Sequence, residues 1–493
     1  MSRSQQSKSQ FFDRALRVSA FATGTLALIV AAIPTMYEYF GDGRDPMTNA
    51  VNEAMLRSQE ETAKLNLPDA RQMLARAAGE NPALPAHTYG TPQFNRADVL
   101  TDPDRRISEE FLIPPGLKDR VGFWFDIYSR YDSNKRVIHH ALYPWVIYKV
   151  VDVEPIINAS YPRFRWMRNE VANNLVKKEL ASVRKALESL SKKHRASDLD
   201  DRKLKTDEIM VRDALSQLGG DVRRLAKRAR GEVRVQTGQR DFIAEGIQLA
   251  PRYMSTMEDI FRQHKLPIEL TRLPLVESSF NKHAQSKVGA MGVWQFMESS
   301  GKRQKLVVNN MIDERKSIYK STHAAASQLK ENHLILHRSW ALAVTAWNHG
   351  PNGVRKAYRA AGTKDLPRII ELYHSKSFSF ASENFFSEFL AALYTERYAD
   401  RIFPGLPRHA PLDVQELRLA RKLRVDDLLR ASGLTMDDFI SINPDLAKLV
   451  KAKRPLHKGL RIHVPSESRS AIEELISGRD PVRDGKRLIG ANG

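Results

Sequence analysis

The segment between Ile247 and Pro404 is a succession of helix-forming stretches separated by short breaks at glycine, asparagine or proline. Pro267 can start one helix, because the first turn of a helix tolerates proline. Ser321 can cap a second helix, STHAAASQLKENHLILH, and the run WALAVTAWN indicates a third. Helices that follow one another this closely restrict the fold to a mainly α-helical one. We therefore predict a compact α-helical domain over residues 247–405.

The preceding regions predict smaller units. Residues 38–106 include a sequence with several prolines and asparagines that is typical of a linker. Residues 107–246 predict a mainly helical accessory domain, in which VGFWFDIYSRY and ALYPWVIYKVV are short strands or buried segments. The run NEVANNLVKKELASVRKALESL has apolar residues at about every 3.6 positions, which indicates an amphipathic helix.

A different pattern begins after Pro404. ELRLARKLR alternates like a strand, VDDLLRAS and TMDDFISIN are short helices separated by Gly433, and GLRIHVP closes as a second strand. This order predicts a small βααβ module over residues 411–465. The remaining residues 466–493 are charged and contain glycine, so we expect a partly disordered tail.

An uncharged run of about 20 residues, 18–37, is long enough to cross a bilayer as a helix. Basic side chains precede this run, so residues 1–17 should stay in the cytoplasm while the rest is exported. The protein would then lie in the periplasm, anchored to the inner membrane. A cleaved signal peptide is the alternative, because residues 30–32 are small and suit a cleavage site.

The formal net charge of +20 favours an anionic partner, such as nucleic acid, acidic lipid or a carboxylate-bearing cell-wall polymer. An exported protein seldom meets nucleic acid, so we expect no nucleic-acid partner. The basic run 223–240 then predicts a solvated helix face, or a contact with wall or lipid.

Metal and thiol chemistry find little support in the sequence. The chain has no cysteine, which excludes disulfides, thiolate metal sites and a cysteine nucleophile. His333 and His337 have a spacing that can bind metal, but no third ligand is evident nearby. His139 and His140 lead to the same interpretation, and we expect neither a metal nor a cofactor.

Residues 274–297, PLVESSFNKHAQSKVGAMGVWQFM, place one carboxylate among apolar neighbours and follow it with a glycine-rich turn. On a helix, Glu277 would share a face with Leu273 and Phe280. Such neighbours exclude water from the carboxylate and favour its neutral form. A neutral carboxylic acid can give its proton to a glycosidic oxygen. Glu277 is therefore the predicted acid of a sugar-cleaving site.

Five blocks of sequence together resemble the lytic transglycosylase family, specifically the goose-lysozyme-like catalytic domain of its membrane-bound D type. They occur in the family's order: LPIELTRLPLVESSFN (266–281), AQSKVGAMGVWQFM (284–297), DER (313–315) with STHAAA (321–326), AVTAWNHGPNGV (343–354) and SENFFSEFLAAL (382–393). The resemblance implies a lysozyme-like α-helical catalytic domain over residues 247–405.

The resemblance also assigns site residues. It implies that Glu277 is the catalytic acid, with Ser278 beside it as a supporting hydrogen-bond donor. In the family, the turn after this helix forms one wall of the sugar groove, so Gln295 is the expected polar contact, and Trp294 and Met297 shape that wall. The block AWNHG supplies an asparagine, Asn348, that holds the acetamido sugar.

Three segments depart from the family pattern. Trp347 stands where tyrosine is more usual, which keeps a ring for stacking but removes a hydroxyl. Phe385 and Phe386 occupy positions where relatives place a tyrosine, so we expect no catalytic hydroxyl from that segment. Ser317 and Ile318 replace the Asp-Pro that usually follows DER, which we interpret as a loop difference.

The implied chemistry follows from a missing second acid. Hydrolytic glycosidases normally use two carboxylates, and the nearest candidates beside Glu277 are Asp313 and Glu314, which are structural in the family. The resemblance implies that Glu277 alone cleaves the MurNAc-GlcNAc bond of peptidoglycan, first as acid and then as base, leaving 1,6-anhydromuramoyl ends. A lysozyme-like muramidase or chitinase-like hydrolase, and a non-catalytic peptidoglycan-binding protein, are the alternatives.

The C-terminal module carries a second resemblance. GLTMDDFISINPDL (433–446) and GLRIHVP (459–465) are similar to a divergent LysM unit. The LysM family binds chains that contain N-acetylglucosamine, which implies the same ligand here. A structural appendage that no longer binds glycan is equally compatible with these residues.

Overall fold

The computed structural model describes residues 94–160 and 164–478. The predictions for the N-terminus (1–17), the membrane-spanning or signal segment (18–37), most of the linker (38–106) and residues 479–493 of the tail lie outside this part. Within residues 94–160 and 164–478, no helix is both long and apolar enough to cross a membrane.

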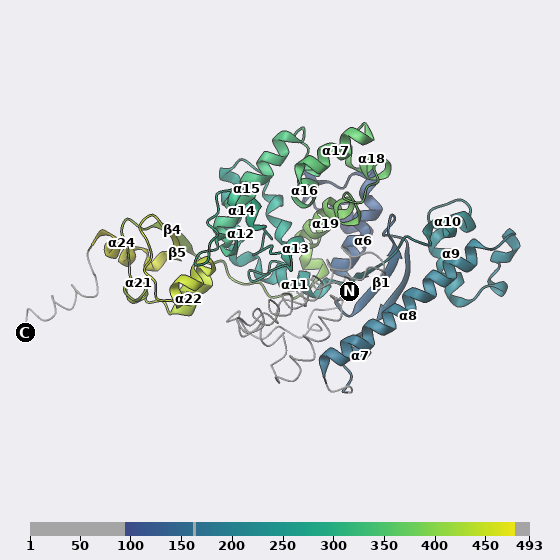
Figure 1. Cartoon of the computed structure of the whole chain (residues 1–493), viewed down its shortest axis with the longest axis horizontal. Helices are drawn as coiled ribbons and strands as arrows, with labels where there is room; N and C mark the ends of the chain where they lie inside the picture. Colours follow the sequence, from purple (N-terminus) through teal and green to yellow (C-terminus); the bar gives the residue numbers. More distant parts are fainter. Residues whose placement is uncertain (1–93, 161–163, 479–493) are drawn as a thin grey trace, which may run out of the picture. The chain divides into compact units, whose positions relative to one another are not determined.

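The first described part combines helices with a three-stranded antiparallel sheet of order β2-β1-β3. The helices α7 to α10 all lie in the connection between β2 and β3 (Figure 1). The elements are α5 (Arg96–Leu100), α6 (Lys118–Ser129), β1 (Lys135–His140), β2 (Ile147–Asp152), α7 (Glu154–Ile157), α8 (Arg165–Ser191), α9 (Thr206–Ser216), α10 (Val222–Ala229) and β3 (Val233–Thr237).

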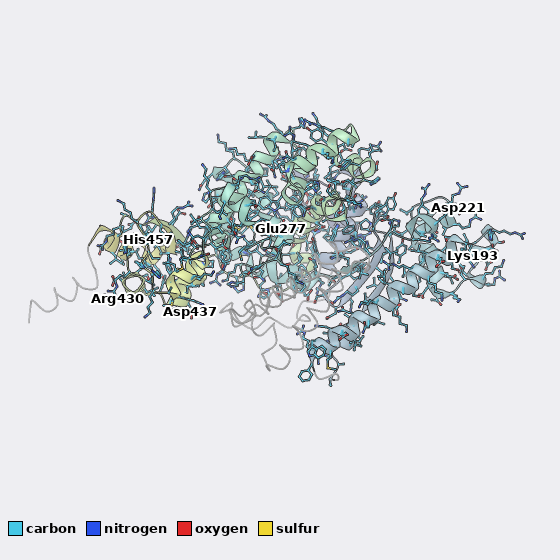
Figure 2. All side chains as sticks on the ribbon, in the orientation of Figure 1. Lys193, Asp221, Glu277, Arg430, Asp437 and His457 are labelled. Atoms are coloured by element: carbon cyan, nitrogen blue, oxygen red, sulfur yellow. The ribbon has the colours of Figure 1, made fainter. Side chains whose placement is uncertain are left out.

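Some sequence predictions for this part are confirmed, and others need correction. The amphipathic run forms α8, whose Val183, Leu187 and Leu190 are buried. The basic run starts in α10 and continues into β3. Asp221, labelled in Figure 2, caps α10 by accepting a hydrogen bond from the Arg223 N–H. VGFWFDIYSRY, expected as a strand or buried segment, lies mostly in helix α6. This helix is buried on nearly all sides, and an all-round apolar helix has the same pattern as a buried strand.

The helical domain predicted for the centre of the chain is confirmed as mainly helical. Its helices are α11 (Arg240–Leu249), α12 (Pro251–Gln263), α13 (Leu273–Ser278), α14 (Glu298–Arg303), α15 (Ile318–Ile335), α16 (Trp340–His349), α17 (Pro351–Ala361), α18 (Leu366–Leu372), α19 (Phe380–Arg397) and α20 (Ala399–Ile402). The largely buried α19 packs against α6, α13 and α16, so one hydrophobic core joins the central helices to the accessory helix α6.

Two helix starts differ from the sequence predictions. Pro267 precedes a short 3₁₀ helix, η6 (Ile268–Arg272), which leads into α13, instead of starting one continuous helix. Ser317 caps α15 by accepting a hydrogen bond from the Lys320 N–H, so the cap is not Ser321. Ser321 lies one turn inside the helix, where its hydroxyl donates to carbonyl oxygens of the preceding turn.

The two strands and two helices predicted for the C-terminal module are present in the predicted order, with a third short helix, α23, before the second strand. Its elements are β4 (Val414–Arg418), α21 (Val425–Ser432), α22 (Met436–Ile442), α23 (Ala447–Lys451), β5 (Arg461–Pro465) and α24 (Arg469–Ser477). The two strands pair antiparallel, with Leu417 opposite Ile462. The tail prediction is wrong for α24, because Ile472 and Leu475 are buried in the core of the module.

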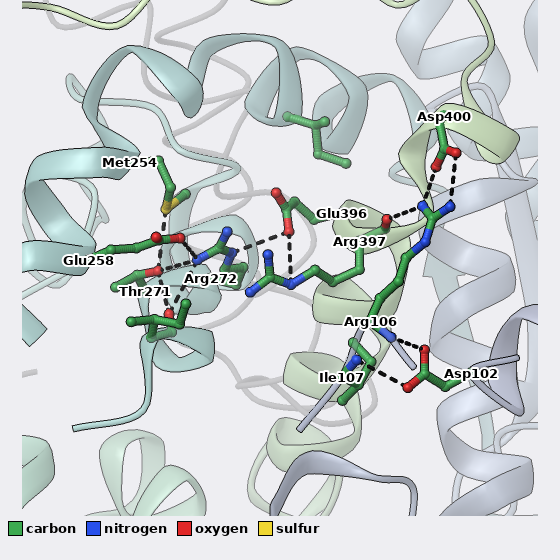
Figure 3. Close-up of polar contacts among 12 residues, drawn as sticks. Asp102, Arg106, Ile107, Met254, Glu258, Thr271, Arg272, Glu396, Arg397 and Asp400 are labelled. Carbon is green, nitrogen blue, oxygen red and sulfur yellow. Dashed lines mark hydrogen bonds and ion pairs between the residues drawn. The ribbon is translucent and has the colours of Figure 1, made fainter. Parts of the chain in front are cut away.

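A buried arginine joins the helical elements of the central domain (Figure 3). Arg272 is 3% exposed and lies at the junction of η6 and α13. Its guanidinium pairs with Glu258 on α12, and its Nε lies 3.2 Å from Glu396 on α19. Burial alone would raise the pKa of Glu396, but Arg272 and Arg397 outweigh burial and hold that pKa below its usual range.

Replacing Arg272 should destabilise the whole domain. Arg272→Met leaves Glu258 and Glu396 without their buried cation, and we expect the free energy of unfolding to fall by about 3–5 kcal/mol. Denaturant unfolding measures this change. Arg368→Met is the matched control, because Arg368 pairs with Glu371 on the surface and should contribute about 0–1 kcal/mol. Equal losses for the two variants would contradict a central role for Arg272.

Candidate active site

Glu277 lies in the last turn of α13, within the helical domain (Figure 2). The helix ends at Ser278, and Ser279 and Phe280 both have positive φ, of 49° and 62°. Phe280 is buried but lies beyond the helix end, so the prediction that it shares a helical face with Glu277 is wrong. The positive φ values of Ser279 and Phe280 turn the chain sharply after α13 and lead it into the glycine-containing segment 284–297.

The electrostatic setting of Glu277 matches the requirement for a proton donor. Burial raises the pKa of the Glu277 carboxyl from its usual 4.5 to about 8, and a hydrogen bond from the Trp347 side chain opposes this shift. The carboxyl is therefore neutral at pH 7. The only hydrogen-bonding atom of an indole ring is its N–H, so Trp347 acts on this carboxyl as a donor.

Trp347 comes from α16 and is fixed by aromatic contacts. Its ring lies 5.3 Å from Phe296 in an edge-to-face arrangement and 5.7 Å from Trp294, measured between ring centroids. The side chain is half-buried. A hydroxyl is missing here, as the sequence indicates, but the ring brings a different hydrogen-bond donor to the acid.

Residues 284–297, called the wall segment below, form a compact turn held by bridges from Met291 to Gln285 and Phe296. At Gly292, φ is +75° and an added Cβ would lie 2.1 Å from the carbonyl oxygen of Arg315, so only glycine fits. The Ser278 hydroxyl donates to the Val293 carbonyl at 3.0 Å. Ser278 thus ties the end of α13 to the wall segment, next to Glu277.

Three side chains predicted to line the sugar groove have different placements. Met297 is 39% exposed and accessible to a ligand. Trp294 is fully buried, where its ring stacks on Phe261 and its N–H donates to Thr322. The amide nitrogen of Gln295 donates to backbone carbonyls of the wall segment itself, so its contribution in this structure is to the shape of the turn.

Asn348 is exposed at the end of α16, one residue after Trp347. The Ser382 hydroxyl lies 3.3 Å from Asn348 Oδ1 and 2.9 Å from His349 Nδ1. Ser382 and His349 were missed by the sequence prediction. Both belong to blocks that carry the family resemblance, but their pairing joins α16 to α19 and only the fold reveals it.

The two acids that the sequence offered as a second carboxylate, Asp313 and Glu314, are paired with cations elsewhere. The Asp313 carboxylate pairs with Arg315 at 2.8 Å, and Glu314 pairs with Lys320 at 3.1 Å. A carboxylate that sequence reasoning overlooked is Glu383 on α19, which follows Ser382 and is 6% exposed. Burial raises its pKa, while the positive charge of Arg120 opposes the rise.

The four histidines considered above as possible metal ligands contact other side chains of the fold. His333 stacks on Trp340 with ring centroids 3.7 Å apart, and His337 Nε2 lies 3.1 Å from the Tyr358 hydroxyl. His139 is buried between Phe123 and Phe380. Across the part of the chain that the structure describes, no three metal-binding side chains are grouped around a possible ion.

Comparison with known proteins identifies the domain that holds this site. Residues 258–369 match the family model described as "Transglycosylase SLT domain". We call the part of the central domain that matches this model the SLT domain. The match includes Glu277, the wall segment, Trp347 and Asn348, whereas Ser382 and Glu383 lie beyond its end.

Part of the chain is also similar to curated proteins of two kinds. "Membrane-bound lytic murein transglycosylase D" of Escherichia coli (strain K12) is 34% identical over 110 residues, which are 22% of this chain and 24% of that protein. A protein of Alteromonas sp. (strain M-1) named for tributyltin chloride resistance is also 34% identical over 110 residues, which are 53% of its length. The similarity thus spans from a quarter to half of these relatives.

The raised pKa of Glu277 predicts how stability depends on pH. Between about pH 4.5 and 8 the folded SLT domain keeps this proton while the unfolded chain loses it, so stability falls as pH rises. The neutral amide of Glu277→Gln lacks this cost. We expect the variant to gain about 1.4 kcal/mol relative to wild type for each pH unit in this window, and to gain no more above it.

Denaturant unfolding from pH 4 to pH 9 checks this prediction. Glu371→Gln, on the exposed surface of α18, controls for the substitution itself. If the curves of Glu277→Gln and wild type run parallel across the whole range, the native carboxyl has an ordinary pKa and the assignment of a neutral acid is wrong.

Proposed function

We propose that this protein is a lytic transglycosylase, which cleaves the β-1,4 bond between N-acetylmuramic acid and N-acetylglucosamine in peptidoglycan without consuming water. The observation that carries the proposal is the neutral Glu277 carboxyl, with a pKa of about 8, inside an SLT domain. The relative from Escherichia coli is named as a murein transglycosylase, which supports the same substrate and reaction.

Glu277 would act twice in this reaction. As a neutral acid it protonates the glycosidic oxygen, and the bond from that oxygen to C1 of the muramic acid breaks. As a carboxylate it then takes the proton of the C6 hydroxyl of the same sugar, whose oxygen forms a new bond to C1. Glu277 returns to its neutral form, and the product is a 1,6-anhydromuramoyl end.

The neighbouring side chains fit the two stages. The indole donor of Trp347 stabilises the carboxylate stage, because it lowers the pKa of Glu277. Positive charge that develops at C1 is stabilised by the N-acetyl group of the sugar itself, which Asn348 would hold. Ser382 fixes the side chain of Asn348 from α19.

A hydrolase that uses the same domain is the second candidate, and Glu383 is the observation in its favour. Such enzymes need a second carboxylate to activate water or to bind the sugar covalently. Glu383 is a buried acid one residue from Ser382, which contacts Asn348. The two reactions differ in their products, because hydrolysis adds one water for each bond cleaved and the anhydro product contains none.

The cellular setting is part of the proposal. We propose that residues 18–37 anchor the protein to the inner membrane, or are removed as a signal peptide, so that the SLT domain acts in the periplasm. The relative from Escherichia coli is named as membrane-bound, which supports a place in the cell envelope. The positive net charge of the chain suits a wall polymer whose peptides carry carboxylates.

Substitution of the proposed acid tests the reaction directly. Glu277→Gln should lower the rate of peptidoglycan solubilisation by about 10²–10⁴-fold, because an amide cannot donate the proton. Binding, measured by sedimentation with insoluble peptidoglycan, should be retained. Mass analysis of wild-type products should give anhydro ends; products heavier by one water would favour the hydrolase. Binding by a wild-type protein that releases no fragments would indicate a non-catalytic role.

The indole donor makes a separate prediction about pH. Trp347→Phe keeps a ring against Phe296 but removes the hydrogen bond that lowers the pKa of Glu277. The alkaline limb of the pH–rate profile should move to higher pH, and the maximal rate should fall by about tenfold. Trp340→Phe is the matched control on the same helix, because Trp340 stacks on His333. An unmoved limb in Trp347→Phe would show that the indole does not act on the acid.

A further inference from the structure

The C-terminal module is joined to the SLT domain by a buried group of charges. Lys320 on α15 is 1% exposed, and its Nζ lies 2.6 Å from Asp445 Oδ2 and 3.1 Å from Glu314 Oε1. Asp445 belongs to the module, in the short 3₁₀ helix η8 (Pro444–Leu446) after α22. Because both charges are buried, removal of either one would leave the other without this partner away from water.

Further contacts surround this ion group. The backbone N–H of Asp313 donates to the carbonyl of Asp445 at 3.1 Å. Tyr319 and His463 stack with ring centroids 4.2 Å apart and an angle of 21° between the rings. Met311 and Ile312, which precede Asp313, pack against the hydrophobic core of the module. The module therefore docks on segment 311–320 through charge, backbone and apolar contacts together.

The same segment also holds the wall of the candidate site. The Arg315 guanidinium pairs with the Asp313 carboxylate and donates to the carbonyl oxygens of Gly289 at 2.8 Å and Phe296 at 3.2 Å. These two carbonyls belong to the wall segment. The Arg315 backbone carbonyl is also the atom against which Gly292 packs. Arg315 thus contacts the wall segment at Gly289, Gly292 and Phe296. Its two preceding neighbours face the module: the Asp313 N–H donates to the Asp445 carbonyl, and Glu314 pairs with Lys320, the partner of Asp445.

We propose that the C-terminal module positions the wall segment of the SLT domain, acting through Asp445, Lys320 and the segment 313–315. The module is then a structural part of the catalytic unit, in addition to any glycan that its outer surface binds. Asp445 is a positioning residue that acts on substrate through Arg315. The inference deepens the proposed function, and it rests on that function wherever turnover is the readout.

The proposal separates two roles that a LysM-like module can have. A tethering domain helps only on insoluble peptidoglycan, where it keeps the enzyme near its substrate. A module that positions the wall segment affects every substrate, including soluble glycan strands that the SLT domain binds alone. Turnover of soluble, uncrosslinked glycan strands therefore reports on positioning without tethering.

The first experiment uses the full chain and the substitution Asp445→Asn. The amide removes one of the two negative charges that Lys320 faces, and we expect KM for soluble strands to rise on the order of tenfold with a smaller change in kcat, since Glu277 itself is untouched. Asp437→Asn is the matched control: Asp437 is an exposed residue of α22 in the same module (Figure 2). It should behave like wild type. An unchanged KM in Asp445→Asn would overturn the proposal.

A double-mutant cycle separates positioning from simple loss of stability. Asp445→Asn, Arg315→Lys and the double variant are compared at a temperature where all three remain folded by circular dichroism. If Asp445 acts through Arg315, the double variant should lose no more than the worse single variant. Losses that multiply would mean that the two residues act independently, and would contradict the proposed route.

Hydrogen exchange gives a readout that does not depend on activity. In Asp445→Asn, amides of residues 284–297 should exchange at least about tenfold faster than in Asp437→Asn, because their support through Arg315 is loosened. Equal exchange in the two variants would overturn the inference. A wild-type chain that cleaves no strands would overturn the proposed function, and the exchange comparison would still decide whether the module supports the wall segment.

Discussion

Arg272 is the contact on which the arrangement around Glu277 depends. It stands five residues before Glu277 and pairs with carboxylates from α12 and α19 in the interior of the domain. It also directly precedes the first residue of α13, so these pairs hold the start of the helix whose last turn carries the acid. The hydrogen bonds of Arg106 to the carbonyl of Arg397 and to Asp400 extend the same network to the end of α19.

Two partly buried carboxylates of the central domain, Glu396 and Glu277, have opposite chemistry. Glu396 has a cation in contact, so its pKa is lowered and it remains charged. Glu277 has only an indole donor, so desolvation dominates and its pKa rises to about 8. The difference arises from what each helix places opposite the acid, and not from the depth of burial. Arg272 and Arg397 thus keep Glu396 ionised, whereas among the described residues no charged group opposes the effect of burial on Glu277.

The sequence predicted the elements that have strong local signals. The amphipathic run α8, the short helices α21 and α22 and the strands of the module were found from periodicity and turn residues. The apolar helix α6 was not, because burial on all sides removes the periodicity that identifies a helix. Local pattern also placed the cap of α15 at Ser321, although Ser317 satisfies the first turn of that helix.

The candidate site was predictable to the extent that it lies in continuous blocks. Glu277 could be named from its own neighbours and Asn348 from the family resemblance of its block, but Ser382 and Glu383 acquire a role only because α19 packs against α16. The Trp294 side chain likewise points into the core, where its ring stacks on Phe261, and does not lie on the surface of the wall segment. Residues whose function arises from contacts between distant helices carry no signal in a local window of sequence.

Trp347 shows how a departure from a family pattern constrains mechanism. A tyrosine hydroxyl can both donate and accept a hydrogen bond, whereas an indole N–H can only donate. In this chain, Trp347 can therefore stabilise the carboxylate form of Glu277 but cannot relay a proton to or from it. Phe385 and Phe386, buried on α19, supply no hydroxyl either. If the proposed reaction takes place, both proton transfers must pass through the Glu277 carboxyl itself, and its pKa near neutrality is what allows one group to act in both directions.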